Sequence, residues 1–331
     1  DGIDGADGNV GADGADGNQG PDGNQGPDGN PGPNLAGTTS QTIRHNGTDW
    51  IATSNLSNDG TTVSTDADMS INGITVGKGG GAGGAGGANT ALGTNALLSN
   101  TTGGSNTASG NAALESNTTG GGNTALGNST LSLNTTGVAN TALGNLALYY
   151  NTTGNNNTAS GVQSLYSNTT GIKNVALGHQ ALQLNTTGGS NTASGYQSLH
   201  YNTTGNNNTA SGYQSLHYNT TGYYNTANGV YALNLNTTGI KNVALGHQAL
   251  QLNTTGGSNT ASGYQSLHYN TTGNNNTASG VQSLYSNTTG IKNVALGHQA
   301  LQLNTTGGSN TASGYQSLHY NTTGNNNTAS G

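Results

Sequence analysis

Residues 191–207 read N-T-A-S-G-Y-Q-S-L-H-Y-N-T-T-G-N-N, and this seventeen-residue pattern decides the fold. It recurs from Asn89 without insertion or deletion, giving fourteen complete units and a fifteenth that stops after five residues at Gly331. A fixed short period indicates a solenoid, in which each coil buries its apolar face only by stacking on its neighbours. We therefore expect residues 89–331 to form an all-β solenoid of parallel seventeen-residue coils.

The invariant positions of the unit predict its core and its bends. Numbered from the first Asn, positions 1, 3, 5, 9 and 12 to 15 never change in a complete copy. Ala193 at position 3 and Leu199 at position 9 are predicted to point into the coil, because the residues beside them in a strand alternate outward. Gly195 at position 5 and the N-T-T-G run that ends at Gly205 mark two bends. This pattern predicts two short strands per coil.

Two asparagines in each unit are predicted to form ladders along the fibre. Asn191 stands at position 1 and Asn202 at position 12. An amide both donates and accepts, so identical Asn side chains about 4.8 Å apart can hydrogen-bond from coil to coil. The run N-T-T is also an N-glycosylation sequon, which is the alternative interpretation. We favour the ladder, because the turn needs this amide chemistry in any case.

The variable positions 6, 7, 10, 11, 16 and 17 carry nearly all the Tyr and His of the array. We expect these side chains to form exposed stripes along the rod. Such stripes would bind a ligand such as a glycan, pack filaments side by side, or serve only as solvent-facing surface. In two successive units the stripe residues are Tyr196, His200, Tyr201, Tyr213, His217 and Tyr218.

The apolar content of one unit is too small to order seventeen residues by itself. One Leu and one Ala bury little area, whereas every ordered residue loses backbone entropy. We therefore expect a second buried face, formed by positions 4 and 8, that contacts two other copies of the chain. Position 4 varies among Leu, Ser and Asn, as at Leu177, Ser194 and Asn228.

Residues 1–33 have the collagen pattern, with Gly at every third position from Gly2 to Gly32. Only Gly fits at the crowded axis of three polyproline-II chains, so this period predicts a triple helix and hence a homotrimer. Seven Asp and no Lys or Arg lie in this segment. Repulsion among three copies should weaken it, and calcium that bridges the Asp rows is a further hypothesis.

A different composition separates the collagen pattern from the array. Residues 34–78 hold turn signals at 46–47 (Asn-Gly) and 59–60 (Asp-Gly) between β-type residues, which predicts short hairpins in a small trimeric neck. Trp50 is the chain's one tryptophan, and we expect it to anchor the packing of the neck rather than to stack on a sugar. Residues 79–88 are Gly-rich and are interpreted as a linker.

Composition and charge exclude several classes of function. Charged residues make up 5% of the chain, the net charge is −7, and eleven of the twelve acids precede residue 70. The array has three Lys, too few for a surface that follows a nucleic-acid backbone. No apolar run reaches the length of a membrane span. No catalytic, cofactor or metal constellation is recognisable, so we expect no enzyme and no cofactor.

The unit N-T-A-x-G…A-L…N-T-T-G from Asn89 onward resembles the repeats of bacteriophage tail-fibre proteins. It is also similar to the β-roll heads of trimeric autotransporter adhesins, whose coils carry an N-S-V-A-I-G-like motif at the place of Asn89 to Gly93. Residues 46–63, after collagen triplets, resemble the necks of such surface fibres. The resemblance implies a left-handed parallel β-roll of three chains and a role in attachment, although the unit is longer than a typical adhesin coil.

A longer repeat in the array favours a structural role. Residues 242–280 and 293–331 are identical at an offset of three units. A shaft tolerates a change of length by whole coils, whereas an active site does not. We therefore expect an extracellular homotrimeric fibre, on a cell surface or in a virion tail, that assembles with itself end to end or laterally. A bacteriophage tail fibre that binds a host-surface glycan is the alternative.

Overall fold

The computed structural model describes residues 89–331 continuously and, before them, only six short strands. The contacts divide the chain into two units, Asp1–Thr65 and Asp66–Gly331, which we describe separately. The predicted collagen-like segment 1–33, its calcium hypothesis and the linker 79–88 lie outside the described residues and stay predictions.

The first unit contains two antiparallel hairpins. Strand β1 (Thr42–His45) pairs with β2 (Trp50–Thr53), and β3 (Leu56–Asn58) pairs with β4 (Val63–Thr65). The turn signals of the sequence lie between the paired strands, as the hairpin prediction requires. Trp50 is the first residue of β2, opposite His45, and its side chain lies outside the described part of the chain.

The second unit begins with a hairpin and continues as one long parallel ladder. Strand β5 (Met69–Ile71) pairs antiparallel with β6 (Ile74–Gly77), and β6 pairs antiparallel with β7 (Thr90–Leu92). From β7 onward each repeat contributes one strand, parallel to the strand before it. These strands are β8 (Thr107–Ser109), β9 (Thr124–Leu126), β10 (Thr141–Leu143), β11 (Thr158–Ser160), β12 (Val175–Leu177), β13 (Thr192–Ser194), β14 (Thr209–Ser211), β15 (Thr226–Asn228), β16 (Val243–Leu245), β17 (Thr260–Ser262), β18 (Thr277–Ser279), β19 (Val294–Leu296), β20 (Thr311–Ser313) and β21 (Thr328–Ser330).

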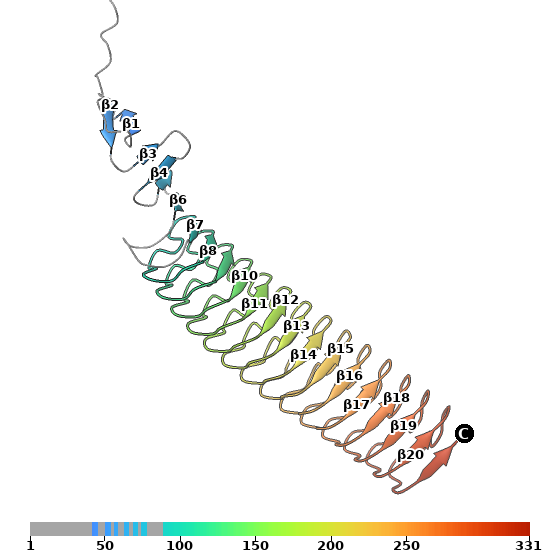
Figure 1. Ribbon diagram of the computed structural model, residues 1–331. Helices are drawn as coiled ribbons and strands as arrows, with labels where there is room; N and C mark the ends of the chain where they lie inside the picture. The colour runs from blue at the N-terminus through green and yellow to red at the C-terminus, as the bar shows by residue number, and fades with distance from the viewer. Residues whose placement is uncertain are drawn as a thin grey trace, which may run out of the picture. The chain divides into compact units, whose positions relative to one another are not determined.

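The ladder is in perfect register with the sequence repeat. Ala193 pairs with Ala176 on one side and with Ala210 on the other, so each coil advances the chain by one seventeen-residue unit. Figure 1 shows the coils stacked one on the next from β7 to β20. The described residues include no helix, and therefore none that could span a membrane. The predicted all-β solenoid of parallel seventeen-residue coils is confirmed.

The prediction of two strands per coil is wrong. Each coil has one strand, at positions 2 to 4, and positions 6 to 11 form a series of turns. Within these turns positions 7 and 9 have positive φ, for example 52° at Gln197 and 51° at Leu199. A residue in the left-handed region cannot continue a β-strand, so the backbone turns there instead. The coils still bond to each other here, because Leu199 N–H donates to Ser215 O at 3.0 Å.

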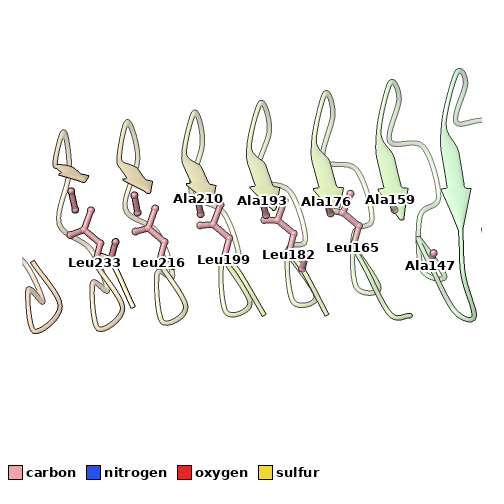
Figure 2. Close-up of a cluster of buried hydrophobic side chains, with 14 of the residues drawn as sticks. Ala147, Ala159, Leu165, Ala176, Leu182, Ala193, Leu199, Ala210, Leu216 and Leu233 are labelled. Carbon is pink, nitrogen blue, oxygen red and sulfur yellow. The ribbon is translucent and has the colours of Figure 1, made fainter. Parts of the chain in front are cut away.

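The core is a row of small and branched side chains inside the coils. Ala193 and Leu199 are fully buried, and their copies form continuous columns (Figure 2). Position 8 also lies inside its own coil, as at the fully buried Ala181 and Ser198. The prediction that position 8 contacts other chains is therefore wrong: the coil is so narrow that its own interior takes this side chain. Position 4 is different, because Leu177 is 41% exposed.

Candidate functional site: the side-chain columns

Each coil from residue 106 to residue 309 holds two buried asparagines that hydrogen-bond to their copies in the preceding coil. Asn191 Nδ2 lies 3.2 Å from Asn174 Oδ1, and Asn202 Nδ2 donates to Asn185 Oδ1 at 2.8 Å. Both amides also donate to one carbonyl of their own coil, Gly205 O, at 2.8 and 3.0 Å. The two ladders therefore meet at Gly205, which explains why positions 1, 12 and 15 are invariant.

This geometry bears on the sequon. Asn202 is the asparagine of an N-T-T run, it is fully buried, and its Nδ2 donates to both Asn185 Oδ1 and Gly205 O. A glycan bonded to Nδ2 would replace one of these N–H donors and would need space inside the coil. The ladder and a glycan at this position thus exclude each other in the folded coil.

The invariant glycines allow the coils to approach closely. Gly195 has a φ of 134°, and a Cβ built there would lie 2.6 Å from Gly212 O in the next coil. A side chain at Gly205 would overlap Gly222 O and Asn202 Oδ1. Both positions need glycine because the neighbouring backbone takes the space that a Cβ would fill.

Two further columns have no counterpart in the sequence predictions. The backbone N–H groups of Thr186, Thr187 and Gly188 all donate to Thr203 O, at 2.9 to 3.3 Å, and Thr186 Oγ1 adds a fourth bond at 3.0 Å. At position 7, Gln197 Nε2 donates to a glutamine oxygen of the preceding coil at 2.7 Å. The signals that could have found them are the strict recurrence of N-T-T-G and the presence of Gln at position 7 in nine of the fourteen complete units.

For the six stripe residues named above, the predicted exposure is correct for the four tyrosines and wrong for the two histidines. The histidines at position 6, His179, His247 and His298, are exposed as predicted. The tyrosines of the two coils are 38 to 43% exposed: Tyr196, Tyr201, Tyr213 and Tyr218. His200 and His217 are buried, with 7% and 6% exposed. Their rings stack on each other at a centroid distance of 5.1 Å, and an adjacent tyrosine ring covers each at 4.6 Å. His217 Nδ1 lies 3.0 Å from the backbone oxygen of Gln197. His200 Nδ1 lies 3.4 Å from the backbone oxygen of Gln180. Ring stacking and these backbone contacts remove both imidazoles from the solvent.

The tyrosine columns present ring edges rather than ring faces. Tyr196 lies between His179 and Tyr213, at 5.3 and 5.2 Å and within 7° of parallel. Tyr201 and Tyr218 stack at 5.2 Å and 8°. Offset stacking covers the faces of these rings with the rings of adjacent coils. A sugar that packs on an aromatic face finds little open ring surface along these stacked pairs.

The buried histidines should make the array sensitive to acid. Burial lowers the pKa of His217, and burial together with the charge of His217 lowers the pKa of His200. The unfolded chain then binds more protons than the folded one, so stability is complete above about pH 6.5 and declines as the pH falls through that value. We expect the urea midpoint to drop between pH 7.5 and pH 5, measured by circular dichroism.

His268 is a third buried histidine of this column, and burial likewise lowers its pKa. The matched variant for this experiment is His200→Gln/His217→Gln/His268→Gln. Glutamine already stands at the same position in other coils, for example at Gln183, so the fold should accept it. The variant should lose less stability between the two pH values than the wild type. An equal loss in both proteins would assign the acid sensitivity to other groups.

Within the described residues, no three His, Asp or Glu side chains come together as a metal site would require. No protein-family model, curated protein or solved structure matches the chain.

Proposed function

We propose that this chain forms the shaft of an extracellular homotrimeric fibre that serves surface attachment. The observation that carries the proposal is the unbroken ladder from β7 to β21, in which invariant columns of Ala, Leu and Asn fill the interior of the coils. Such a stack can gain or lose whole coils without changing its cross-section, and residues 242–280 recur identically as 293–331. The proposal contains no catalytic step and no cofactor.

The proposed trimer rests on two independent features. The Gly-x-y triplets of residues 1–33 are the pattern of a three-chain helix. In the array, large apolar side chains recur at position 4 on the outer side of the strands, and Leu177, Leu245 and Leu296 are 40 to 42% exposed. We propose that this strand face contacts the other two chains. The left-handed β-roll remains part of the proposal through the resemblance to adhesin and tail-fibre repeats.

The second candidate is the same fibre in a virion tail, where it binds a host-surface glycan. The exposed tyrosines favour an outward-facing ligand surface, although their stacked faces limit sugar packing on the columns. The two candidates differ in location, cell surface or virion, and in whether the shaft itself binds carbohydrate.

The oligomeric state tests the proposal. Sedimentation of the full chain should give three times the monomer mass of 32.7 kDa. The variant Leu177→Lys/Leu245→Lys/Leu296→Lys should lower the melting temperature of the array by several degrees, because it places charge in the proposed contact face. The matched control is Val162→Lys/Val230→Lys/Val281→Lys, at position 6, where the valines are equally exposed.

A well-ordered monomer in sedimentation would overturn the proposed trimer. If the trimer forms and the leucine variant has the same melting temperature as the valine variant, position 4 is not the contact face.

A further inference from the structure

A shallow notch of 410 Å³ interrupts one edge of the coils. Position 16 runs through four successive coils as Ile172, Gly189, Asn206 and Tyr223. Gly189 is buried and forms the floor, whereas Ile172 and Tyr223 are exposed and form the two ends. Position 17 adds a second row of lining residues, Ser190, Asn207 and Tyr224. The notch exists because the smaller residues Gly189 and Asn206 lie between the larger Ile172 and Tyr223 along this column.

The floor of the notch is held rigidly. Gly189 N–H donates to Asn206 Oδ1 at 2.7 Å, and Asn206 Nδ2 donates to Thr204 O at 2.8 Å. The backbone N–H of Asn207 donates to Gly189 O at 3.1 Å. An amide nitrogen carries two N–H donors, so Asn206 can use its second one toward a ligand. A site fixed before binding loses less entropy when the ligand arrives.

Tyr223 and Tyr224 differ from the tyrosines of the stacked columns. The residues above and below Tyr223 are Asn206 and Ile240, and no aromatic residue occupies position 17 in either coil next to Tyr224. The two rings meet edge to face, with centroids 5.4 Å apart at 74°. They are 40% and 56% exposed. No ring of an adjacent coil lies parallel to them, so aromatic surface is open at this end of the notch.

We propose that this notch binds a pyranose unit of a neutral carbohydrate. The tyrosine rings of its lining can pack against the apolar C–H surface of a sugar ring. The amides of Asn206 and Asn207 and the hydroxyl of Ser190 can hydrogen-bond to the sugar hydroxyls. No charged side chain lines it. Its volume lies in the range of small-ligand sites. The proposal does not require the trimer, which sedimentation tests separately.

The chain contains its own control for this site. Residues 172–212 and 240–280 are identical, so Ile240, Gly257 and Asn274 repeat the frame of the notch. Its hydrogen bonds also recur, with Gly257 N–H to Asn274 Oδ1 at 2.7 Å and Asn274 Nδ2 to Thr272 O at 2.7 Å. The second frame ends in residues 291–292, Ile-Lys, where the first ends in Tyr-Tyr. The first site therefore has two tyrosine rings at its end, and the second site has none there.

Saturation-transfer NMR on the full chain tests the proposal, with the methyl glycosides of glucose, galactose, mannose and N-acetylglucosamine as probes. We expect transfer to at least one of them in the wild type. The variant Tyr223→Ile/Tyr224→Lys copies residues 291–292, so it should fold, and it should bind that probe about tenfold more weakly or not at all. The reciprocal variant Ile291→Tyr/Lys292→Tyr should raise the number of sites from one to two.

Three results would overturn the proposal. They are the absence of transfer to every probe in the wild type, binding that the Tyr223→Ile/Tyr224→Lys variant leaves unchanged, and binding restricted to sialosides in a parallel panel. The third result would assign recognition to the neighbouring lysines Lys173 and Lys241 instead of to the tyrosine rings. Circular dichroism of each variant verifies that the coils are intact.

Discussion

Replacement of Gly110 by alanine is expected to open the stack at the second coil. Gly110 has a φ of 138°, a region that residues with a side chain rarely adopt, and the new Cβ would lie 2.6 Å from the carbonyl carbon of Gly127. The coils cannot separate to make room without loss of the bond from Gly127 N–H to Ser109 O, 2.8 Å long. Strain and clash together should cost about 3 kcal/mol or more.

The matched control is Gly122→Ala in the same coil. Gly122 also has a positive φ, 67°, but a Cβ added there would meet no atom closer than 3.9 Å. The next coil already carries alanine at this place, Ala139, with a φ of 55°. This substitution should change the stability by less than about 1 kcal/mol. Guanidinium unfolding followed by circular dichroism compares the two variants, and equal losses would show that close approach of the coils is not what requires glycine at position 5.

The position of the damage is as informative as its size. Coils contact only their neighbours, so a defect in one coil weakens its two interfaces and not the whole array. Hydrogen exchange of the Gly110→Ala variant should therefore show lost protection around β7 to β9, while β14 to β20 stay protected. Loss of protection along the whole array would contradict this nearest-neighbour picture.

The period and the invariant residues were enough to predict the stack of parallel coils. A residue that cannot vary within a repeat must face something that also repeats, and the burial of Ala193, Leu199, Asn191 and Asn202 follows that logic. The path of the chain between these residues was not predictable. Leu199 is buried, but it lies in a turn with a φ of 51°. Leucine does not favour the left-handed region, so its presence in the sequence does not predict this conformation.

Burial of His200 and His217 could not be predicted for a different reason. Tyr and His at variable positions of the unit predict an exposed side chain, because a single Tyr or His without an aromatic neighbour is in contact with the solvent. His200 is buried because His217 stacks on it and Tyr201 covers it, so its environment depends on two residues, one from its own coil and one from the next coil. The notch at Gly189 likewise arises from the differences between units, which an analysis of their common pattern leaves out.

Substitution of Asn202 by aspartate should be the second severe change. The two side chains have the same shape, but Asp replaces the Nδ2 donor with an oxygen. That oxygen would face two acceptors, Asn185 Oδ1 at 2.8 Å and Gly205 O at 3.0 Å. The site is fully buried, so the carboxylate would also lose its hydration. An uncompensated buried charge costs about 3 to 5 kcal/mol, and we expect a loss of that size in guanidinium unfolding.

The comparison with Asn207→Asp separates the ladder from the charge. Asn207 belongs to the same coil, the change of atoms is identical, and its side chain is exposed. Its φ of 56° suits Asp as well as Asn. The loss there should stay within about 0.5 kcal/mol. If both variants lose the same stability, added charge alone explains the effect; if only Asn202→Asp is unstable, the donor at position 12 holds adjacent coils together, and the invariance of this asparagine is a requirement of the ladder.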